Sequence, residues 1–431
     1  MFFSKINKKV LCDSDLGYKR DAVVNTFRLF DFLLGILLLW MPSACSFDAF
    51  DDYLPIDDTL YPYANLPRFV IETRDFREIR NTEVYVDGVM QVYDAGTPNG
   101  EIVELGIRGR GNSSFTAPKS AFRLKLKSKS SLLDMPPNRD WALLPNYMDK
   151  SLLRNFITSK MAMADSLSWI PKFRFVELFV NREYLGVYQL SEKIEISSER
   201  LNLSGDSYLV EIDYKSKEGE QVVFSRKSVP FRLHSPKIAT DSILAKLVEH
   251  INGFELFLEK ECYSIDSIRK WIDIDSYVQY YWIQELSKNV DGAFKTSVYF
   301  SWDGEGSIIM GPIWDFDAAY GAAYDKSPEG WRIRKKYWNY YLFKNEEFSQ
   351  VVRSYWFEHR KDYIAVADSI VSYGRQLDKA AQNNFERWPI LDEKVLLDQS
   401  VEQYGNYEQA VLSLQKWLYL RIKWIDEQYE Y

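Results

Sequence analysis

Residues 285–321, ELSKNVDGAFKTSVYFSWDGEGSIIMGPIWDFDAAYG, decide how the rest of the sequence is interpreted. A β-branched and aromatic stretch at residues 298–301 is followed by a turn-like segment and by a second apolar stretch that ends at residue 310. This pattern predicts a β-hairpin. Asp291 precedes the hairpin and Asp315 follows it. Because a hairpin returns the chain to its start, it can bring these two carboxylates together.

A carboxylate on each side of a hairpin is also how protein kinases place a catalytic Asp and a metal-binding Asp. The structural alternative is that Asp291 and Asp303 are turn residues, and that Asp315 and Asp317 form a solvated strand end. Spacing alone favours this structural alternative, so other parts of the sequence must decide between the two.

The composition indicates a packed globular protein with few options for redox or metal chemistry. The 431 residues are 46% hydrophobic and 16% aromatic, which is enough for two lobes with separate cores. Aromatic side chains can mark a carbohydrate-contacting surface, but burial in a core or a lobe interface is their commoner use. A net charge of −8 argues against nucleic acid and anionic membrane surfaces as partners. Three cysteines and three histidines provide no disulfide framework, zinc site or histidine triad.

The N-terminus has the pattern of an export signal. Residues 32–41 are uncharged and leucine-rich, too short to span a membrane but typical of the apolar core of a signal peptide. Small residues then precede Cys45, as in a bacterial lipoprotein cleavage site. We therefore predict a basic leader and signal peptide at residues 1–44, lipidation of Cys45, and an acidic tether at residues 45–65. The mature chain would be exported and anchored at the bacterial cell surface or in the periplasm. The alternative is a soluble chain with a short buried helix.

Residues 66–235 are predicted to be a β-rich nucleotide lobe. Their pattern predicts strands at residues 69–73 and 84–86, a turn at Asp87-Gly88, and a returning strand at residues 89–93. A glycine-containing loop follows the next strand, and residues 121–127 then alternate strictly between apolar and basic side chains.

This loop between two strands is a candidate phosphate-binding element. Gly109 and Gly111 have no Cβ, so the backbone N–H groups of the loop, including Asn112, can approach a phosphate. A lysine of the next strand can then reach the phosphates, and Lys125 is our candidate. Lys119 and Arg123 are alternatives for that role. An ordinary hairpin turn and a charged strand surface are the structural alternatives.

The second half of the sequence changes from strand to helix periodicity. A helix is predicted from residue 149 to about residue 164. Residues 208–213, YLVEID, form a further strand whose backbone is a candidate hinge for adenine, or simply a sheet strand. Helical periodicity dominates from residue 241 onward, so residues 236–431 are predicted to be a mainly helical catalytic lobe into which the central hairpin is set.

Several segments together resemble one known family. The segments ELSKNVDG, TSVYF and GPIWDFDAAYG resemble the spore-coat CotH kinase family of atypical kinase-like proteins. The upstream segments RGRGNSSFTAPKSAFRLKL, WALLPNYMDKSLLRN, ELFVNREYLGVYQLSEKI and YLVEID agree with the family in the same order. The resemblance runs from residue 66 to the C-terminus. It implies an α+β, atypical protein-kinase-like two-lobed fold with a β-rich N-terminal lobe and a mainly helical C-terminal lobe.

The resemblance also implies roles for individual residues. Asp291 would accept or orient the proton of the substrate hydroxyl, and Asp315 would bind Mg²⁺ that bridges the phosphates of ATP. Thr296 stands five residues after Asp291, where kinases have a metal-binding Asn, and this is a departure from the pattern. Asp317 would hold a second metal ion or cap the next turn.

Two functions follow from these observations. The first is a CotH-like atypical kinase that transfers the γ-phosphate of ATP to Ser or Thr hydroxyls of secreted or surface proteins. The second is a non-catalytic, surface-anchored binding or structural module on the same fold. Its partner would be a protein or a polysaccharide. Neither function involves nucleic acid, and membrane contact is expected only through the lipid anchor.

Overall fold

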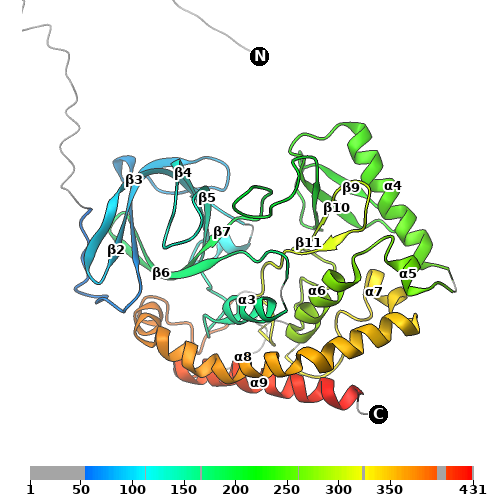
Figure 1. Ribbon diagram of the computed structural model, residues 1–431. Coiled ribbons are helices and arrows are strands. Elements are labelled where there is room, and N and C mark those ends of the chain that lie inside the picture. Colours follow the sequence, from blue (N-terminus) through cyan, green and yellow to red (C-terminus); the bar gives the residue numbers. More distant parts are fainter. Residues whose placement is uncertain are drawn as a thin grey trace, which may run out of the picture. The chain divides into compact units, whose positions relative to one another are not determined.

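The N-terminal part of the described chain forms a closed barrel of seven strands (Figure 1). The computed structural model describes residues 54–111, 113–165, 167–260, 262–322, 326–395 and 404–429. The strands follow the order β1-β2-β3-β4-β5-β7-β6, and β1 closes the barrel by pairing in parallel with β6. The barrel strands are β1 (Arg68–Thr73), β2 (Val86–Asp94), β3 (Thr97–Gly109), β4 (Phe122–Ser130), β5 (Asn138–Leu144), β6 (Phe173–Val180) and β7 (Glu183–Glu192).

Alternation along β4 shows how the sequence builds the barrel. Phe122, Leu124 and Leu126 are buried in the barrel core, whereas Arg123 and Lys125 point to the other face. Because successive side chains of a strand face opposite ways, one face of β4 fills the barrel and the other carries charge. The predicted alternating strand at residues 121–127 is confirmed.

The predicted turn at Asp87-Gly88 is wrong, because β2 runs through this dipeptide without a break. Gly88 pairs with Thr73 on one side and with Leu105 on the other. A Cβ at Gly88 would lie 2.5 Å from the carbonyl oxygen of Glu72. The glycine therefore permits a close approach of neighbouring strands. The chain reverses instead at Ala95-Gly96, where both residues have positive φ.

A second sheet of five strands has the order β12-β11-β8-β10-β9. Its β11–β12 pair is the predicted hairpin, which is confirmed by the pairing of Phe300 with Met310. One face is apolar and packs in the main hydrophobic core, while the other carries charged and polar side chains. The strands are β8 (Tyr208–Ile212), β9 (Val222–Phe224), β10 (Pro230–Ser235), β11 (Val298–Trp302) and β12 (Ile309–Met310).

The C-terminal part of the described chain is helical, so the protein combines a β-rich N-terminal region with a helical C-terminal part. Side-chain oxygens of Thr240, Asp273 and Asn345 cap the N-termini of α4, α6 and α8. The short helical segments nearer the N-terminus are η1 (Arg74–Phe76), α2 (Ser113–Thr116) and α3 (Arg154–Ala164). The later helices are α4 (Asp241–Leu258), α5 (Ile265–Ile268), α6 (Ile274–Ser287), α7 (Tyr337–Leu342), α8 (Glu346–Arg387) and α9 (Tyr407–Tyr429).

Helix α3 begins later than the sequence predicts. The carboxylate of Asp149 accepts hydrogen bonds from the backbone N–H groups of Ser151 and Arg154, and it also forms an ion pair with the Arg154 side chain. Leu152 has a φ of 59°. This left-handed residue cannot continue a right-handed helix, so residues 149–153 form a capped turn and α3 starts at Arg154.

No described helix is both long enough and apolar enough to cross a membrane. Cys45 and the predicted leader and signal peptide at residues 1–44 lie outside the described residues. Lipidation and export remain predictions.

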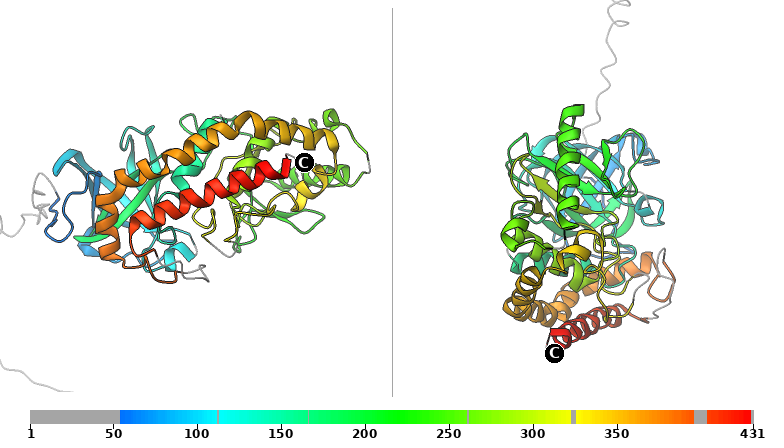
Figure 2. Two further views of the ribbon diagram at one scale, coloured as in Figure 1. Left: turned by 90° about the horizontal axis from the view of Figure 1, so that it is seen from below. Right: turned by 90° about the vertical axis from the view of Figure 1, so that its right-hand side faces the viewer.

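The 42-residue helix α8 connects the barrel with the helical part of the protein. Helix α9 runs alongside it (Figure 2), and α8 also packs against β7 and α3. Near the C-terminal end of α8, the Asn384 side-chain oxygen accepts hydrogen bonds from Val187 N (3.0 Å) and from the buried ammonium of Lys119 (2.7 Å). One amide oxygen of α8 therefore satisfies two buried donors of the barrel.

Replacing Asn384 is expected to weaken this connection. Asn384→Ala would remove an acceptor from two buried donors, each of which costs about 1–3 kcal/mol when unsatisfied. We expect the free energy of unfolding to fall by about 3 kcal/mol in urea denaturation. Gln382→Ala, at an exposed position of the same helix, should change it by less than about 0.5 kcal/mol. Equal effects of the two substitutions would contradict the account.

A buried acid lies between α3 and α8. Asp165 follows the last residue of α3, and both of its carboxylate oxygens accept hydrogen bonds from the Tyr363 hydroxyl at 2.9 Å. Nδ1 of His359 lies 3.7 Å from the Asp165 carboxylate. Burial raises the pKa of Asp165 to about 7, and this outweighs the lowering by hydrogen bonds from Tyr363 and Tyr355. The folded protein therefore holds a proton here that the unfolded chain releases near pH 4.

The raised pKa of Asp165 predicts a specific pH dependence of stability. The protonated acid contributes its full stability below pH 4, and this contribution is lost as the pH rises through 7. Asp165→Asn keeps a neutral side chain at every pH. The variant should therefore gain on the order of 4 kcal/mol relative to wild type between pH 4 and pH 8, measured by urea denaturation. Asp378→Asn, at an exposed acid of α8 that does not contribute to the pKa shift of Asp165, should follow the wild-type profile. A pH-independent difference for Asp165→Asn would contradict the assignment.

Candidate functional site

A cavity of about 680 Å³ is lined by the barrel, the polar face of the second sheet, and the two segments that carry the predicted acids. The structure brings Gly111, Asp291, Thr296, Asp315 and Asp317 to this one cavity. Gly109 is not among the residues that line it.

Loop geometry after α6 sets the position of the acids. Lys288 ends the helix with a left-handed backbone (φ 47°), and the buried Asn289 follows. The Asn289 side chain accepts a hydrogen bond from Asp291 N (3.2 Å) and donates one to the backbone oxygen of Asp315 (3.2 Å). One amide therefore connects the segment before the hairpin with the segment after it.

Helix α3 holds the second acidic segment from the other side. Asn155 Oδ1 accepts a hydrogen bond from Phe316 N at 2.8 Å, and Arg154 donates through Nε to the backbone oxygen of Ala319. The Tyr320 hydroxyl also contacts Thr158 at 2.7 Å. The first two turns of α3 therefore fix the backbone on both sides of Asp317.

The acids of this cavity oppose one another electrostatically. Burial raises the pKa of both Asp315 and Asp317, and repulsion from the Asp291 carboxylate adds to the shift in each case. Asp317 also shares a hydrogen bond with Asp315, which raises the pKa of Asp317 and lowers that of Asp315. Asp315 is exposed and Asp317 is half-buried, so both side chains are accessible from the cavity. The mutual repulsion of the three carboxylates favours a bound cation.

Oxygen donors of this kind fit Mg²⁺, although the described residues contain no ready-made metal cluster. Across the described ranges, no three His, Cys, Asp or Glu side chains converge as a group that can hold a metal ion. Carboxylates and hydroxyls are nevertheless the hard ligands that Mg²⁺ takes, together with water and phosphate oxygens. The repulsion between Asp291, Asp315 and Asp317 is the feature that a divalent cation would relieve.

Arg110 places a positive charge opposite the acids. It lies between Gly109 and Gly111, and its guanidinium stacks on the Trp314 ring at 5.0 Å. Desolvation lowers the pKa of Arg110, while the charge of Asp315 raises it. In the described part of the chain, this guanidinium has neither a hydrogen bond nor an ion pair. A planar cation with its N–H donors free suits a phosphate or carboxylate group.

The glycines beside Arg110 have distinct local roles. Gly111 has a φ of 80°, and a Cβ there would lie 2.0 Å from the Ser114 hydroxyl oxygen. Gly109 donates its N–H to Asn81 O at 2.9 Å, and a Cβ there would collide with the Phe115 ring. Both glycines allow the tight turn that directs the side chain between them.

The other cations predicted from sequence lie elsewhere or are paired. Lys125 is exposed, with its ammonium 5.9 Å from the centre of the Tyr85 ring, and it does not line the cavity. Arg123 lines the cavity and forms an ion pair with Asp140. Asn112 lies outside the described residues. The sequence pattern predicts a phosphate lysine on the following strand, whereas the structure brings Arg110, which lies between the two glycines of the predicted loop, to the cavity.

The polar face of the second sheet forms the opposite wall. Glu211 and Asp213 project from β8 and the residue after it, with Arg232 on the neighbouring strand β10. His234 Nε2 lies 2.7 Å from the Glu211 carboxylate, and Arg232 lies 3.4 Å from Asp213. The signal for this wall is the alternation of charged and apolar residues in YLVEID and FRLHS.

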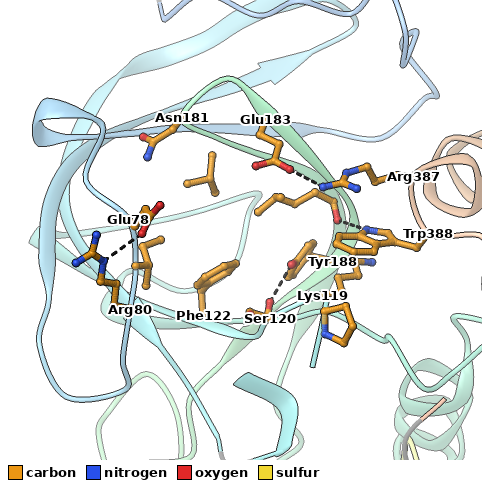
Figure 3. Close-up of a pocket in the computed structure, with 14 residues that line it drawn as sticks. Glu78, Arg80, Lys119, Ser120, Phe122, Asn181, Glu183, Tyr188, Arg387 and Trp388 are labelled. Atoms are coloured by element: carbon orange, nitrogen blue, oxygen red, sulfur yellow. Dashed lines mark hydrogen bonds and ion pairs between the residues drawn. The ribbon is translucent and has the colours of Figure 1, made fainter. Parts of the chain in front are cut away.

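A second cavity, of about 370 Å³, lies where the end of α8 meets the barrel (Figure 3). Its polar side chains are all paired. Arg80 bonds Glu78, Arg387 bonds Glu183, and the Lys119 ammonium donates to Val187 O and to Asn384. Ser120, Asn181 and Tyr188 are likewise hydrogen-bonded. The Lys119–Asn384 and Arg387–Glu183 pairs hold α8 against the barrel, whereas Arg110 in the larger cavity has no such partner among the described residues. Lys119, an alternative phosphate lysine in the sequence analysis, lines this second cavity and not the cavity that contains the acids.

The segment after the second acidic motif is fixed by a buried ion pair. Glu285 of α6 accepts hydrogen bonds from the backbone N–H groups of Arg332, Ile333 and Arg334, and Arg421 of α9 contacts its carboxylate at 2.8 Å. Burial raises the pKa of Glu285, and Arg421 opposes this shift. Arg421 also donates to the backbone oxygens at residues 328 and 330.

Removing the buried arginine should release this segment. Arg421→Met would leave the Glu285 carboxylate buried without its cation, which typically costs about 3–5 kcal/mol. We expect that loss in the free energy of unfolding, together with faster protease cleavage within residues 326–334. Lys423→Met, at an exposed position of the same helix, should behave like wild type. Unchanged cleavage in Arg421→Met would show that the ion pair does not fix the segment.

The mixed α/β fold, with its β-rich N-terminal region and helical C-terminal part, is consistent with the result of a comparison with known families. The family model described as CotH kinase protein matches residues 107–425. The chain therefore belongs to the CotH kinase family, and this membership indicates a kinase-like protein. The match includes Arg110, Thr296 and all three acids of the cavity. No curated protein matches the chain.

Proposed function

We propose that this protein is an ATP-dependent phosphotransferase that transfers the γ-phosphoryl group to serine or threonine hydroxyls of secreted or surface proteins. The observation that carries the proposal is the guanidinium of Arg110, which has no ion-pair partner among the described residues and shares a cavity with Asp291, Asp315 and Asp317. The acids favour a divalent cation, and the guanidinium favours an oxyanion. ATP with Mg²⁺ supplies both.

The proposal assigns the barrel and the helical part to the two lobes of a kinase-like fold. The barrel contributes Arg110, Arg123 and Lys193 to the cavity, and the helical part contributes the acids. Burial lowers the pKa of Lys193, while Glu195 at 3.5 Å opposes the shift. In this assignment the phosphates contact the barrel side, with Arg110 as the bidentate partner.

Asp315, Asp317 and Thr296 are the residues that would hold Mg²⁺. When bound, the ion would neutralise charge on the nucleotide phosphates. The pairing between Asp315 and Asp317 supports this role, because a cation can take the place of the proton that the two side chains share.

Asp291 is the proposed acceptor of the hydroxyl proton. As the oxygen of the serine or threonine bonds to the γ-phosphorus and the bond to ADP breaks, the proton of that hydroxyl moves to the Asp291 carboxylate. The ammonium of Lys215 lies 3.6 Å from this carboxylate, and its side chain is half exposed. It is therefore placed to contact the acceptor or the transferred phosphoryl group.

The predicted export and lipid anchor at Cys45 form part of the proposal, because they determine which proteins the enzyme would meet. A protein acceptor outside the cytoplasm follows from that placement.

Binding of nucleotide and transfer of phosphate should depend on different residues. With ATP and Mg²⁺ at about one hundred times the dissociation constant, we expect the melting temperature of the full chain to rise by about 3–6 °C. Arg110→Ala and Asp315→Asn should remove most of this rise. Asp291→Ala should retain the rise but lose transfer of labelled phosphate to casein, because its carboxylate acts on the acceptor.

Lys125→Ala provides the matched control, since this side chain is basic and near Arg110 in sequence but lies outside the cavity. It should bind and transfer like wild type. An absence of any nucleotide-dependent rise in melting temperature would overturn the proposal and favour the non-catalytic binding module. Loss of binding in Lys125→Ala, with Arg110→Ala unaffected, would overturn the assignment of the phosphate residue.

A further inference from the structure

The side chain of Thr296 is held by an acid from a distant part of the sequence. Its hydroxyl donates to Asp213 Oδ1 at 2.8 Å, and both residues are almost fully buried (6% and 5% exposed). The two residues are 83 positions apart. They meet because β8 and β11 pair with Ile212 opposite Val298.

The Asp213 carboxylate is itself fixed in place. Oδ1 also accepts a hydrogen bond from Lys215 N at 2.9 Å, and Oδ2 lies 3.4 Å from the guanidinium of Arg232. The backbone oxygen of Asp213 accepts a hydrogen bond from the Ser216 hydroxyl. With donors on both oxygens, Asp213 offers Thr296 a rigid acceptor.

This contact determines which part of the Thr296 hydroxyl is available to the cavity. A hydroxyl has one hydrogen and two lone pairs, and it rotates to suit its partners. Once the hydrogen is directed at Asp213, the lone pairs are left for another ligand. A hydrogen-bond acceptor next to a metal ligand generally makes that ligand a better electron donor. Donation to the Asp213 carboxylate would have this effect on the Thr296 hydroxyl oxygen.

We propose that Asp213 is a positioning residue, which orients Thr296 so that a hydroxyl can serve where kinases use the amide oxygen of an asparagine. The inference rests on the proposed function, because it concerns the residues that would hold Mg²⁺. It explains how the departure from the kinase pattern at residue 296 is compatible with cation binding. In this proposal Asp213 acts through Thr296.

The test measures cation binding without turnover. The full chain is incubated with a non-hydrolysable ATP analogue, and the melting temperature is followed while Mn²⁺ is added, which gives the Mn²⁺ concentration at half-maximal effect. Asp213→Asn should raise this concentration by about tenfold, because the acceptor loses its charge. Thr296→Val, which removes the hydroxyl, should raise it at least as much.

A second substitution separates positioning from general stability. In Asp213→Asn/Thr296→Asn, the new amide oxygen does not depend on residue 213 for its orientation, so the half-maximal Mn²⁺ concentration should return to within about threefold of wild type. The melting temperature without ligand serves as the measure of stability. If Asp213 has only a structural role, Asp213→Asn will lower the melting temperature without ligand and leave the half-maximal Mn²⁺ concentration unchanged. Adding Thr296→Asn will then not lower that concentration.

Failure of this inference is distinguishable from failure of the proposed function. A wild-type protein without any response to nucleotide and Mn²⁺ would overturn the nucleotide site as a whole. A normal wild-type response, with the same Mn²⁺ midpoint in Asp213→Asn, would overturn the positioning role alone.

Discussion

The buried side chain of Asn289 holds together the two segments on which the candidate site depends. Its amide receives a hydrogen bond from the backbone of Asp291 and gives one to the backbone of Asp315. An amide suits this position because it has both a donor and an acceptor. The hairpin brings the segments near each other, α6 and α3 fix them from opposite sides, and Asn289 sets their relative position. The remaining features of the cavity are arranged around that contact.

The charges of the cavity are divided between its walls. Burial raises the pKa of Asp315 and Asp317, and repulsion among the carboxylates of the acidic segments adds to the shift, while Arg110 remains without an ion-pair partner in the described part of the chain. Buried charges are usually paired, as in the Glu285–Arg421 contact, because an unpaired charge is unfavourable away from water. Among the described residues, a guanidinium without an ion-pair partner shares one cavity with carboxylates that repel one another, and this combination indicates a site for a ligand that carries both charges. The second cavity, where every polar side chain has a partner, serves as an internal comparison.

The sequence predicted the elements of the fold better than the details of the site. Periodicity correctly identified the alternating strand at residues 121–127 and the hairpin after residue 297, because their side-chain patterns depend on local geometry. It misread Gly88, since close strand pairing and a turn both require glycine. It could not find the contact between Asp213 and Thr296, because pairing of β8 with β11 sets that contact. Arg110 was within reach of sequence reasoning, as the residue between the two glycines of the predicted loop.

A crystal structure of the protein with Mg²⁺ and a non-hydrolysable ATP analogue would test the central claim most directly. The account predicts that the phosphates lie against the guanidinium of Arg110, with the metal ion bound by Asp315 and with Asp291 facing the terminal phosphate. A nucleotide bound elsewhere would contradict it. So would a cavity that stays free of nucleotide at saturating concentration while Asp315 and Asp317 keep their mutual hydrogen bond.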